Sequence, residues 1–252
     1  KHYSDPDATF GWDSDINDYY FGYTLYNLSV HNPDAHVDLP LLVRYTEARR
    51  HDSVNGIVAL HEFRKHAPDI SVKNVCLDSA NDNYPTYDLL KHWGISPFID
   101  LNKRTGRPDA VPERINIDTD GTPLCNAGHR MVFWGYDRCK HAIKWRSPCV
   151  LGKCDQCGHP CSESPYGRTI YTKPEWDIRL YTPVPRGTEE WKNIYKNRTS
   201  TERINNRILN DYGLHSMRIH GKDHYSFFTM IICICIHLDA WCKTRRTTVL
   251  VE

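Results

Sequence analysis

The alternation of apolar and polar positions predicts an α/β arrangement over the first hundred residues. Aromatic and β-branched residues dominate residues 19–31 and predict a strand, and residues 39–48 predict a second strand joined to it through the turn at Asn32. Apolar positions at helical spacing predict a helix over residues 54–66. The pattern then predicts a strand over 72–78, a helix over 84–93 with Gly94 as its cap, and a strand over 95–101.

Residues 102–165 have a different character. They are rich in Pro, Gly, Cys and basic residues and show little periodicity, which predicts an insertion folded around something other than a hydrophobic core. The pattern beyond them predicts β structure over 166–182, a helix over 188–212 ended by Gly213, and a last helix over 226–243, for which a strand is the alternative. We therefore expect the insertion to separate two parts of one domain, residues 1–101 and 166–252.

This order of elements is similar to a ribonuclease-H-like fold, a mixed sheet flanked by helices. The first strand of that fold is not evident, because the acidic residues Asp5, Asp7 and Asp13 lie in a turn-like context of Pro and Gly. We therefore expect an α/β domain that lacks its first strand and carries a Cys-rich insertion.

Composition narrows the class of protein only slightly. The chain has 252 residues, of which 40% are hydrophobic, and a net charge of +1, so total charge does not indicate nucleic acid. Basic residues are nevertheless dense locally, over 44–50, 140–153, 198–218 and 243–246. The most apolar run, residues 227–238, is too short to span a bilayer. With no secretory signal at the start, we expect a cytoplasmic protein and no membrane partner.

Two segments carry candidate chemistry. Tyr195, Arg198 and Glu202 recur at spacings of three and four, which places them on one face of a helix. Asp78 follows a short apolar strand. Carboxylates from two different elements are what a two-metal phosphoryl-transfer site requires. The simpler interpretations stay open: Asp78 can cap a turn, and Glu202 with Arg198 can form a surface ion pair.

Together these segments resemble the DDE-type bacterial insertion-sequence transposases of the IS4-like group. The resemblance covers nearly the whole chain. It rests on Asp5-Pro-Asp7-Ala8, Gly11-Trp12-Asp13, Phe21-Gly22-Tyr23, Arg50-His51-Asp52-Ser53, Leu77-Asp78-Ser79-Ala80, the Cys-rich insertion and Tyr195-x2-Arg198-x3-Glu202. The last of these is similar to the Tyr–Arg–Glu–Lys signature of the group, although Leu209 stands at the position of its Lys.

The resemblance implies metal-dependent DNA strand cleavage and strand transfer at insertion-sequence ends. Asp78 and Glu202 would be the second and third carboxylates that hold Mg²⁺ or Mn²⁺, with the first carboxylate expected upstream of Lys1. The partners would be DNA and, in the synaptic complex, a second copy of the chain. The alternative is a truncated or degenerate transposase that binds DNA without catalysis, which Leu209 and the missing first strand favour.

The resemblance also implies contacts to DNA. Tyr195 and Arg198 would bind phosphate, and Arg203 or Arg207 would supply the charge that the missing Lys would have carried. Aromatic side chains can stack on bases, and the candidates for that role are Trp12, Trp134 and Trp191, each with core packing as the alternative.

The cysteines indicate a second metal. Six of the ten fall between Cys125 and Cys161. The spacing Cys149-x4-Cys154-x2-Cys157-x3-Cys161 is typical of a structural Zn²⁺ site, and zinc would replace a hydrophobic core in this segment. Reduced free cysteines and a disulfide pair are the alternatives.

Overall fold

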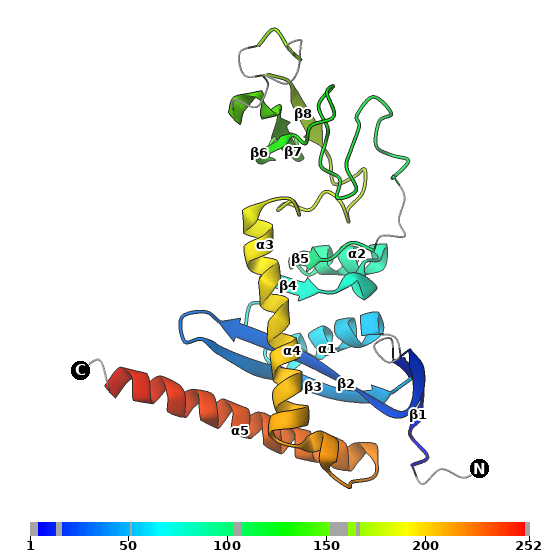
Figure 1. Ribbon diagram of the computed structural model, residues 1–252, viewed down its shortest axis with the longest axis vertical. Helices are drawn as coiled ribbons and strands as arrows, with labels where there is room; N and C mark the ends of the chain where they lie inside the picture. Colours follow the sequence, from blue (N-terminus) through cyan, green and yellow to red (C-terminus); the bar gives the residue numbers. More distant parts are fainter. Residues whose placement is uncertain are drawn as a thin grey trace. The chain divides into compact units, whose positions relative to one another are not determined.

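The computed structural model describes residues 5–13, 17–50, 52–102, 107–151, 161–164 and 167–249. These residues form a mixed α/β protein with three small sheets (Figure 1). The chain divides into two compact units: the first unit comprises residues 1–71 and 197–252, and the second unit comprises residues 72–196.

An antiparallel sheet of order β1-β2-β3 forms the first unit's β structure. Its strands are β1 (Thr9–Asp13), β2 (Asp18–Asn32) and β3 (Val37–Glu47). The predicted pairing of β2 with β3 is confirmed, and the Asn32 side chain accepts hydrogen bonds from the backbone N–H groups of Asp34 and Ala35 at 3.0 and 3.1 Å. The Asn32 side chain therefore fixes the turn that joins the two strands.

Strand β1 contradicts the expectation that no strand precedes residue 18. It has five residues and pairs with the start of β2. Phe10 lies opposite Phe21 with ring centroids 5.1 Å apart, and Trp12 lies opposite Tyr19 at 4.9 Å. Cross-strand aromatic pairs of this kind stabilise a short strand, which Pro6 before it and Gly11 within it conceal in the sequence.

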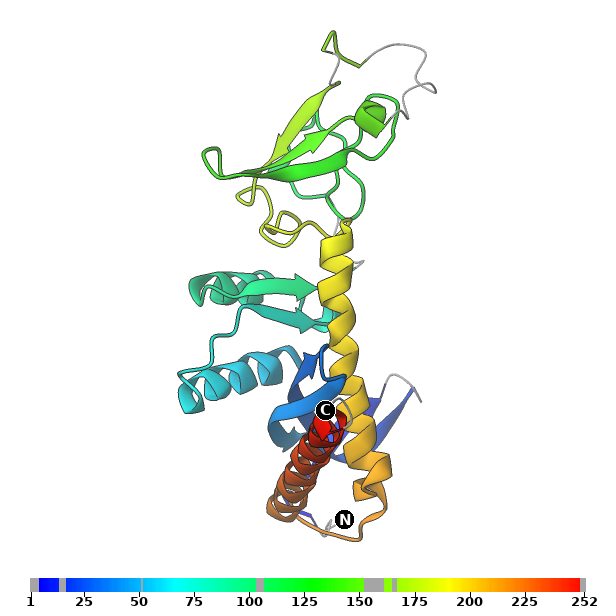
Figure 2. The same cartoon turned by 90° about the vertical axis from the view of Figure 1, so that its left-hand side faces the viewer.

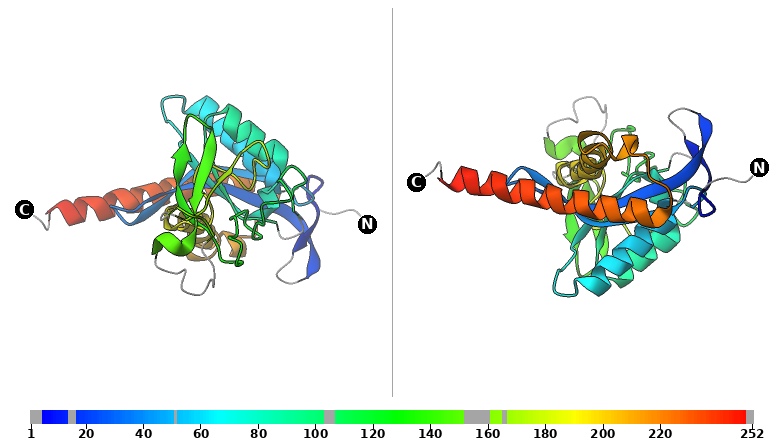
Figure 3. Two further views of the ribbon diagram at one scale, coloured as in Figure 1. Left: turned by 90° about the horizontal axis from the view of Figure 1, so that it is seen from above. Right: turned by 90° about the horizontal axis from the view of Figure 1, so that it is seen from below.

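Helices cover the sheet of the first unit. They are α1 (Asp52–His66), α4 (Thr199–Asn206), the π-helical η5 (Arg207–Asp211), the short η6 (Leu214–Ser216) and α5 (Lys222–Val249). Helix α5 lies along β3 (Figure 3), so its prediction as a helix is confirmed and the strand alternative is wrong. The core between these elements contains Ile204, Ile208, Leu214, Ile232 and Ile236.

The second unit begins with a strand–helix–strand arrangement that matches the prediction (Figure 2). Its elements are β4 (Asn74–Leu77), η1 (Ser79–Asn81), α2 (Tyr84–His92) and β5 (Ser96–Ile99). The two strands are parallel, and Leu77 is the register partner of Ile99. Asn83 caps α2 by accepting a hydrogen bond from the backbone N–H of Thr86 at 3.1 Å, and Gly94 follows the helix with φ +70°.

A second antiparallel sheet, of order β6-β7-β8, follows. Its strands are β6 (Val132–Asp137), β7 (Ala142–Arg146) and β8 (Thr169–Thr172), and the short helix η2 (Pro148–Leu151) comes after β7. They enclose a core of Val111, Ile115, Cys125, Met131, Ile143, Trp145, Ile170, Leu180 and Tyr181. The expectation that residues 102–165 lack a hydrophobic core is therefore wrong. Val111, Ile115 and Cys125 come from irregular segments outside the strands, so the sequence shows no period although the fold brings them together.

The helix predicted over residues 188–212 is present as a succession of helical segments. Helix α3 (Glu189–Tyr195) begins after Thr188, whose hydroxyl accepts a hydrogen bond from the backbone N–H of Trp191 at 3.2 Å. The 3-10 turn η4 (Lys196–Arg198) joins it to α4 and η5, and Gly213 ends the run with φ +72°. The boundary between the two units falls within this run, after Lys196.

Candidate functional site

Asp78 lies directly after β4, at the carboxyl end of the parallel strand pair, and its side chain is exposed. Its Oδ1 accepts hydrogen bonds from the backbone N–H of Ala80 at 3.2 Å and from Asn81 Nδ2 at 2.8 Å. Asp78 thus caps the short helix η1, which confirms the capping interpretation. The hydrogen bonds described for this carboxylate fall on Oδ1, and Oδ2 is the oxygen offered to a ligand.

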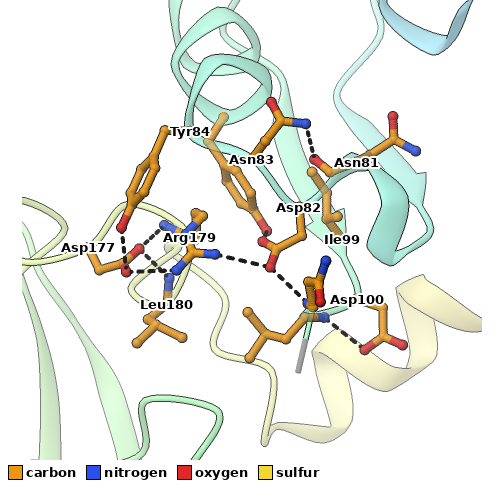
Figure 4. A network of polar contacts seen from close by, with 12 residues as sticks. Asn81, Asp82, Asn83, Tyr84, Ile99, Asp100, Asp177, Arg179 and Leu180 are labelled. Atoms are coloured by element: carbon orange, nitrogen blue, oxygen red, sulfur yellow. Dashed lines mark hydrogen bonds and ion pairs between the residues drawn. The ribbon is translucent and has the colours of Figure 1, made fainter. Parts of the chain in front are cut away.

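A second aspartate that the sequence interpretation missed lies at the same edge. Asp100 follows β5 as Asp78 follows β4, and Leu77 and Ile99 before them are register partners in the parallel pair. Asp100 is exposed, and its Oδ1 accepts a hydrogen bond from the backbone N–H of Leu101 at 2.9 Å (Figure 4). Neighbouring strands lie about 4.8 Å apart, so the two aspartates follow the ends of adjacent strands. The signal in the sequence is an aspartate near the end of each of two predicted strands, 72–78 and 95–101.

Beneath this edge lies a buried network of charges in the second unit (Figure 4). The Arg179 guanidinium donates to Asp82 Oδ2 and to Asp177 Oδ2, both at 3.2 Å. The Arg179 side chain is 4% exposed and both carboxylates are 0% exposed. Tyr84 and Tyr87 add hydroxyl donors to Asp177 and Asp82 at 3.1 and 3.2 Å.

The network connects segments that are far apart in the sequence. Asp82 Oδ2 also accepts from the backbone N–H of Asn102 at 2.8 Å. Arg186 donates through Nε and Nη2 to the carbonyl oxygen of Ile99 at 3.0 and 2.8 Å, and through Nη2 to Tyr87 Oη at 2.6 Å. The start of α2, the end of β5 and the loop that leads to α3 are therefore held together by buried polar contacts.

Glu202 lies in the first turn of α4, and its carboxylate is 58% exposed. Its Oε1 pairs with Arg198 Nη2 at 2.8 Å, one helical turn earlier. The interpretation of these two residues as a surface ion pair is therefore confirmed. Exposed pairs of this kind contribute only about 0.3–0.5 kcal/mol, so the pair can open for a stronger ligand.

The other members of the predicted helix face are divided between the units. Tyr195 belongs to the second unit, where its ring stacks on Trp191 at 4.5 Å, whereas Arg198 and Glu202 belong to the first unit. Asp78 is likewise in the second unit. Neither unit by itself contains the predicted carboxylate pair or the complete Tyr195–Arg198–Glu202 face.

Arg203 and Arg207 tie elements of the first unit together. Arg203 donates from Nε and Nη2 to Asp38 of β3 at 2.5 and 2.8 Å. These hydrogen bonds hold the pKa of the Asp38 carboxyl below its ordinary value. Arg207 donates to Asp239 Oδ2 of α5 at 2.8 Å. A DNA phosphate would therefore compete with a carboxylate for either arginine.

The three tryptophans proposed to stack on bases differ in exposure. Trp191 is 8% exposed and packs near Phe98 with ring centroids 6.3 Å apart, so it is a packing residue. Trp12 and Trp134 are 52% and 47% exposed. The Arg146 guanidinium lies 4.2 Å from the centre of the Trp134 ring.

Two of the four proposed zinc ligands lie within the described residues. Cys149 Sγ and Cys161 Sγ are 4.0 Å apart, close to the roughly 3.8 Å edge of a tetrahedral site with 2.3 Å Zn–S bonds. Cys149 is disulfide-bonded. Cys154 and Cys157 lie outside the described residues. Within the described ranges no three His, Cys, Asp or Glu side chains are grouped as metal ligands.

Cys161 has the surroundings of a reactive thiol. Its burial alone would raise the pKa, but hydrogen bonds with Ser147 Oγ, at 3.3 Å, and with backbone N–H groups outweigh burial, and the pKa of the thiol is lowered. Ser147 Oγ also donates to Cys149 Sγ at 3.1 Å. A lowered thiol pKa favours the thiolate, which is the form that binds metal.

Comparison with known proteins adds no identification. No protein-family model matches the chain, and no curated protein matches it. Its function has to be argued from the residues and their surroundings alone.

Proposed function

We propose that this chain is the catalytic domain of a DNA transposase that cuts and joins DNA strands at insertion-sequence ends with Mg²⁺ or Mn²⁺. The observation that supports the proposal most is the exposed Asp78 at the carboxyl edge of the β4–β5 pair, with Asp100 beside it. Ligands of α/β proteins commonly bind outside the carboxyl ends of parallel strands. Hard divalent cations prefer carboxylate oxygens, and these two are accessible.

The order of elements supports a ribonuclease-H-like fold for this domain. An antiparallel β1-β2-β3 sheet is followed by α1 and then by the parallel β4–β5 unit. The antiparallel and parallel strands form separate sheets among the described residues. The ribonuclease-H-like assignment is therefore part of the proposal, whereas the mixed α/β class is observed.

In this proposal Asp78 and Glu202 would each supply a carboxylate ligand to a divalent ion. Bound Mg²⁺ would activate a water or a 3′-hydroxyl for in-line attack on a phosphodiester and stabilise the leaving oxygen. Asp78 keeps its turn through Oδ1 and offers Oδ2. Glu202 would exchange its exposed ion pair with Arg198 for the ion, and Arg198 would bind the DNA phosphate.

A transposase-derived protein that binds DNA without catalysis is the second candidate. Leu209, which stands in place of the Lys of the signature, packs against the hydrophobic core of the first unit. Arg203 and Arg207 precede Leu209 in the same run of helical segments, and both pair with carboxylates. Both arginines would have to leave their carboxylate partners before they could replace the Lys of the signature.

Strand transfer distinguishes the candidates. The purified chain is incubated with labelled duplex oligonucleotides that carry free 3′-hydroxyls and with supercoiled plasmid, in the presence of Mg²⁺ or Mn²⁺. We expect covalent joining of label to plasmid, abolished by EDTA. Cleavage without joining would identify a nuclease instead, and DNA binding without either product would identify the non-catalytic protein.

We also propose that Cys149 and Cys161 bind a structural Zn²⁺ together with Cys154 and Cys157. The sulfur separation and the lowered thiol pKa of Cys161 support this. The disulfide at Cys149 is the oxidised alternative, because a sulfur in a disulfide cannot bind metal as a thiolate.

Metal analysis of protein purified under reducing conditions tests the zinc site. We expect about one Zn²⁺ per chain, and its loss in Cys161→Ser. Cys139→Ser is the matched control, since Cys139 is a free, exposed cysteine in the turn after β6. Zinc retained in Cys161→Ser, or a folded reduced protein without zinc, would rule the site out.

A further inference from the structure

Helix α5 is apolar on two opposite faces. Its inner face packs on β3, with Ile232 and Ile236 buried and the Thr229 and Tyr45 hydroxyls 3.0 Å apart. Its outer face carries six large apolar side chains that are 42–59% exposed, which we name the outer stripe: Phe227, Met230, Ile231, Ile234, Leu238 and Trp241. A helix that packs on one face only normally has polar residues on the other.

The spacing within the outer stripe is that of a helix–helix seam. Phe227, Ile231, Ile234, Leu238 and Trp241 follow one another at intervals of four, three, four and three residues. Apolar residues at these intervals form the a and d positions of a heptad repeat, through which two helices interdigitate. The outer stripe therefore fits another helix better than it fits a flat surface.

We propose that a second copy of this chain covers the outer stripe, so that two α5 helices pair antiparallel. At about 200 Å² for each large side chain, the stripe exposes on the order of 600 Å². Two copies would bury roughly 1,200 Å² in total, which reaches the lower limit of a stable interface. The patch is at the upper end of the roughly 300–600 Å² that the largest apolar patch on a monomer occupies, and patches of that size are often functional.

Charge at the two ends of the seam favours the antiparallel arrangement. Lys243 and Arg245 follow the stripe, whereas Lys222 and Asp223 precede it and balance each other in charge. In an antiparallel pair centred on Ile234, Arg245 of each helix meets Asp223 of the other. Phe227 then faces Trp241 of the second copy. A parallel pair would bring the four basic side chains together, which costs association energy.

The pairing is independent of the proposed function, because it requires neither DNA nor metal. By length and composition alone, residues 222–245 of α5 are also apolar enough to cross a membrane, the one such helix in the described part of the chain. Polar contacts on the inner face favour a protein partner: His237 Nε2 lies 2.8 Å from the carbonyl oxygen of Pro40, in addition to the Thr229–Tyr45 contact. A lipid surface is the competing occupant in the test below.

Sedimentation velocity of the reduced chain, without DNA, tests the dimer. We expect a concentration-dependent dimer, and Ile234→Asp should raise its dissociation constant about 100-fold by placing charges at the centre of the seam. Ile70→Asp is the matched control, since Ile70 is 55% exposed and lies outside α5, and it should leave the dimer intact. Circular dichroism should show unchanged helix content in both variants, because neither side chain is buried.

A charge-swap tests the orientation. Phe227→Glu and Trp241→Lys should each weaken the dimer, and the double variant should recover at least tenfold, because opposite charges face each other only in the antiparallel pair. Failure to recover would overturn the antiparallel arrangement. A monomeric wild type, a dimer unaffected by Ile234→Asp, or a monomer that floats with phosphatidylglycerol vesicles would overturn the pairing itself.

Discussion

Replacing Arg179 by Met should destabilise the protein by about 3–5 kcal/mol, the largest effect on stability that we expect from any single substitution. The guanidinium is the cation that pairs with both Asp82 and Asp177, whose side chains are fully buried. Methionine approximates the length of the alkyl stem but leaves two buried carboxylates without a cation. Such groups cannot regain their hydration without opening the fold, so the cost falls on the native state.

Urea unfolding of the full chain, followed by tryptophan fluorescence, measures this loss. Arg130→Met is the matched control, since Arg130 also bridges two aspartates of the second unit, Asp118 and Asp120, but is 46% exposed. Its loss should cost less than about 1 kcal/mol. Equal losses of stability in the two variants would show that burial does not increase the effect of removing Arg179.

A second substitution separates lost charge balance from lost packing. Asp82→Asn alone should destabilise the protein, because it removes the charge of a carboxylate that accepts hydrogen bonds from Arg179, Tyr87 and the backbone N–H of Asn102. Added to Arg179→Met it should restore stability, since it removes one of the two uncompensated negative charges. Additive losses in the double variant would indicate that packing rather than charge accounts for the effect.

Local patterns in the sequence predicted most of the elements correctly. The β2–β3 hairpin, α1 and the β4–α2–β5 unit follow from periodicity and from turn and cap residues such as Asn32 and Gly94. These signals work because a hairpin turn or a helix cap depends on neighbours within a few residues. Strand β1 was missed because its stability comes from side-chain pairs across the hairpin, such as Trp12 with Tyr19.

Interactions between distant residues could not be predicted in this way. Arg179 and Asp82 are 97 positions apart, and Arg203 and Asp38 are 165 apart. Nothing in the surroundings of Arg203 distinguishes an arginine that binds a carboxylate from one that binds DNA. The sequence therefore indicated which side chains carry charge, whereas the fold determines which of those charges are already neutralised.

Asp78→Asn and Glu202→Gln should each reduce strand transfer by at least about 1,000-fold, equivalent to roughly 4 kcal/mol of transition-state stabilisation. Both substitutions remove the charge that would hold the divalent ion and keep an oxygen of similar geometry. Asn caps a helix as well as Asp does, so Asp78→Asn should preserve the hydrogen bonds to Ala80 and Asn81. A loss of activity without a loss of stability would therefore report on ion binding rather than on the turn.

Each of these two carboxylates has a control residue that makes the same kind of local contact but lies outside the proposed active site. Asp137 caps the turn after β6 by accepting from Cys139 N and Lys140 N, both at 3.1 Å, so Asp137→Asn tests the effect of changing a capping aspartate in the second unit. Glu189 forms an exposed ion pair with Lys192 at 2.7 Å, as Glu202 does with Arg198. Glu189→Gln is therefore the control for Glu202→Gln. Both control variants should retain wild-type joining of oligonucleotide to plasmid. Full activity in Asp78→Asn would exclude it from the active site, and full activity in Glu202→Gln would leave that residue as a surface ion pair and require the second carboxylate to come from elsewhere.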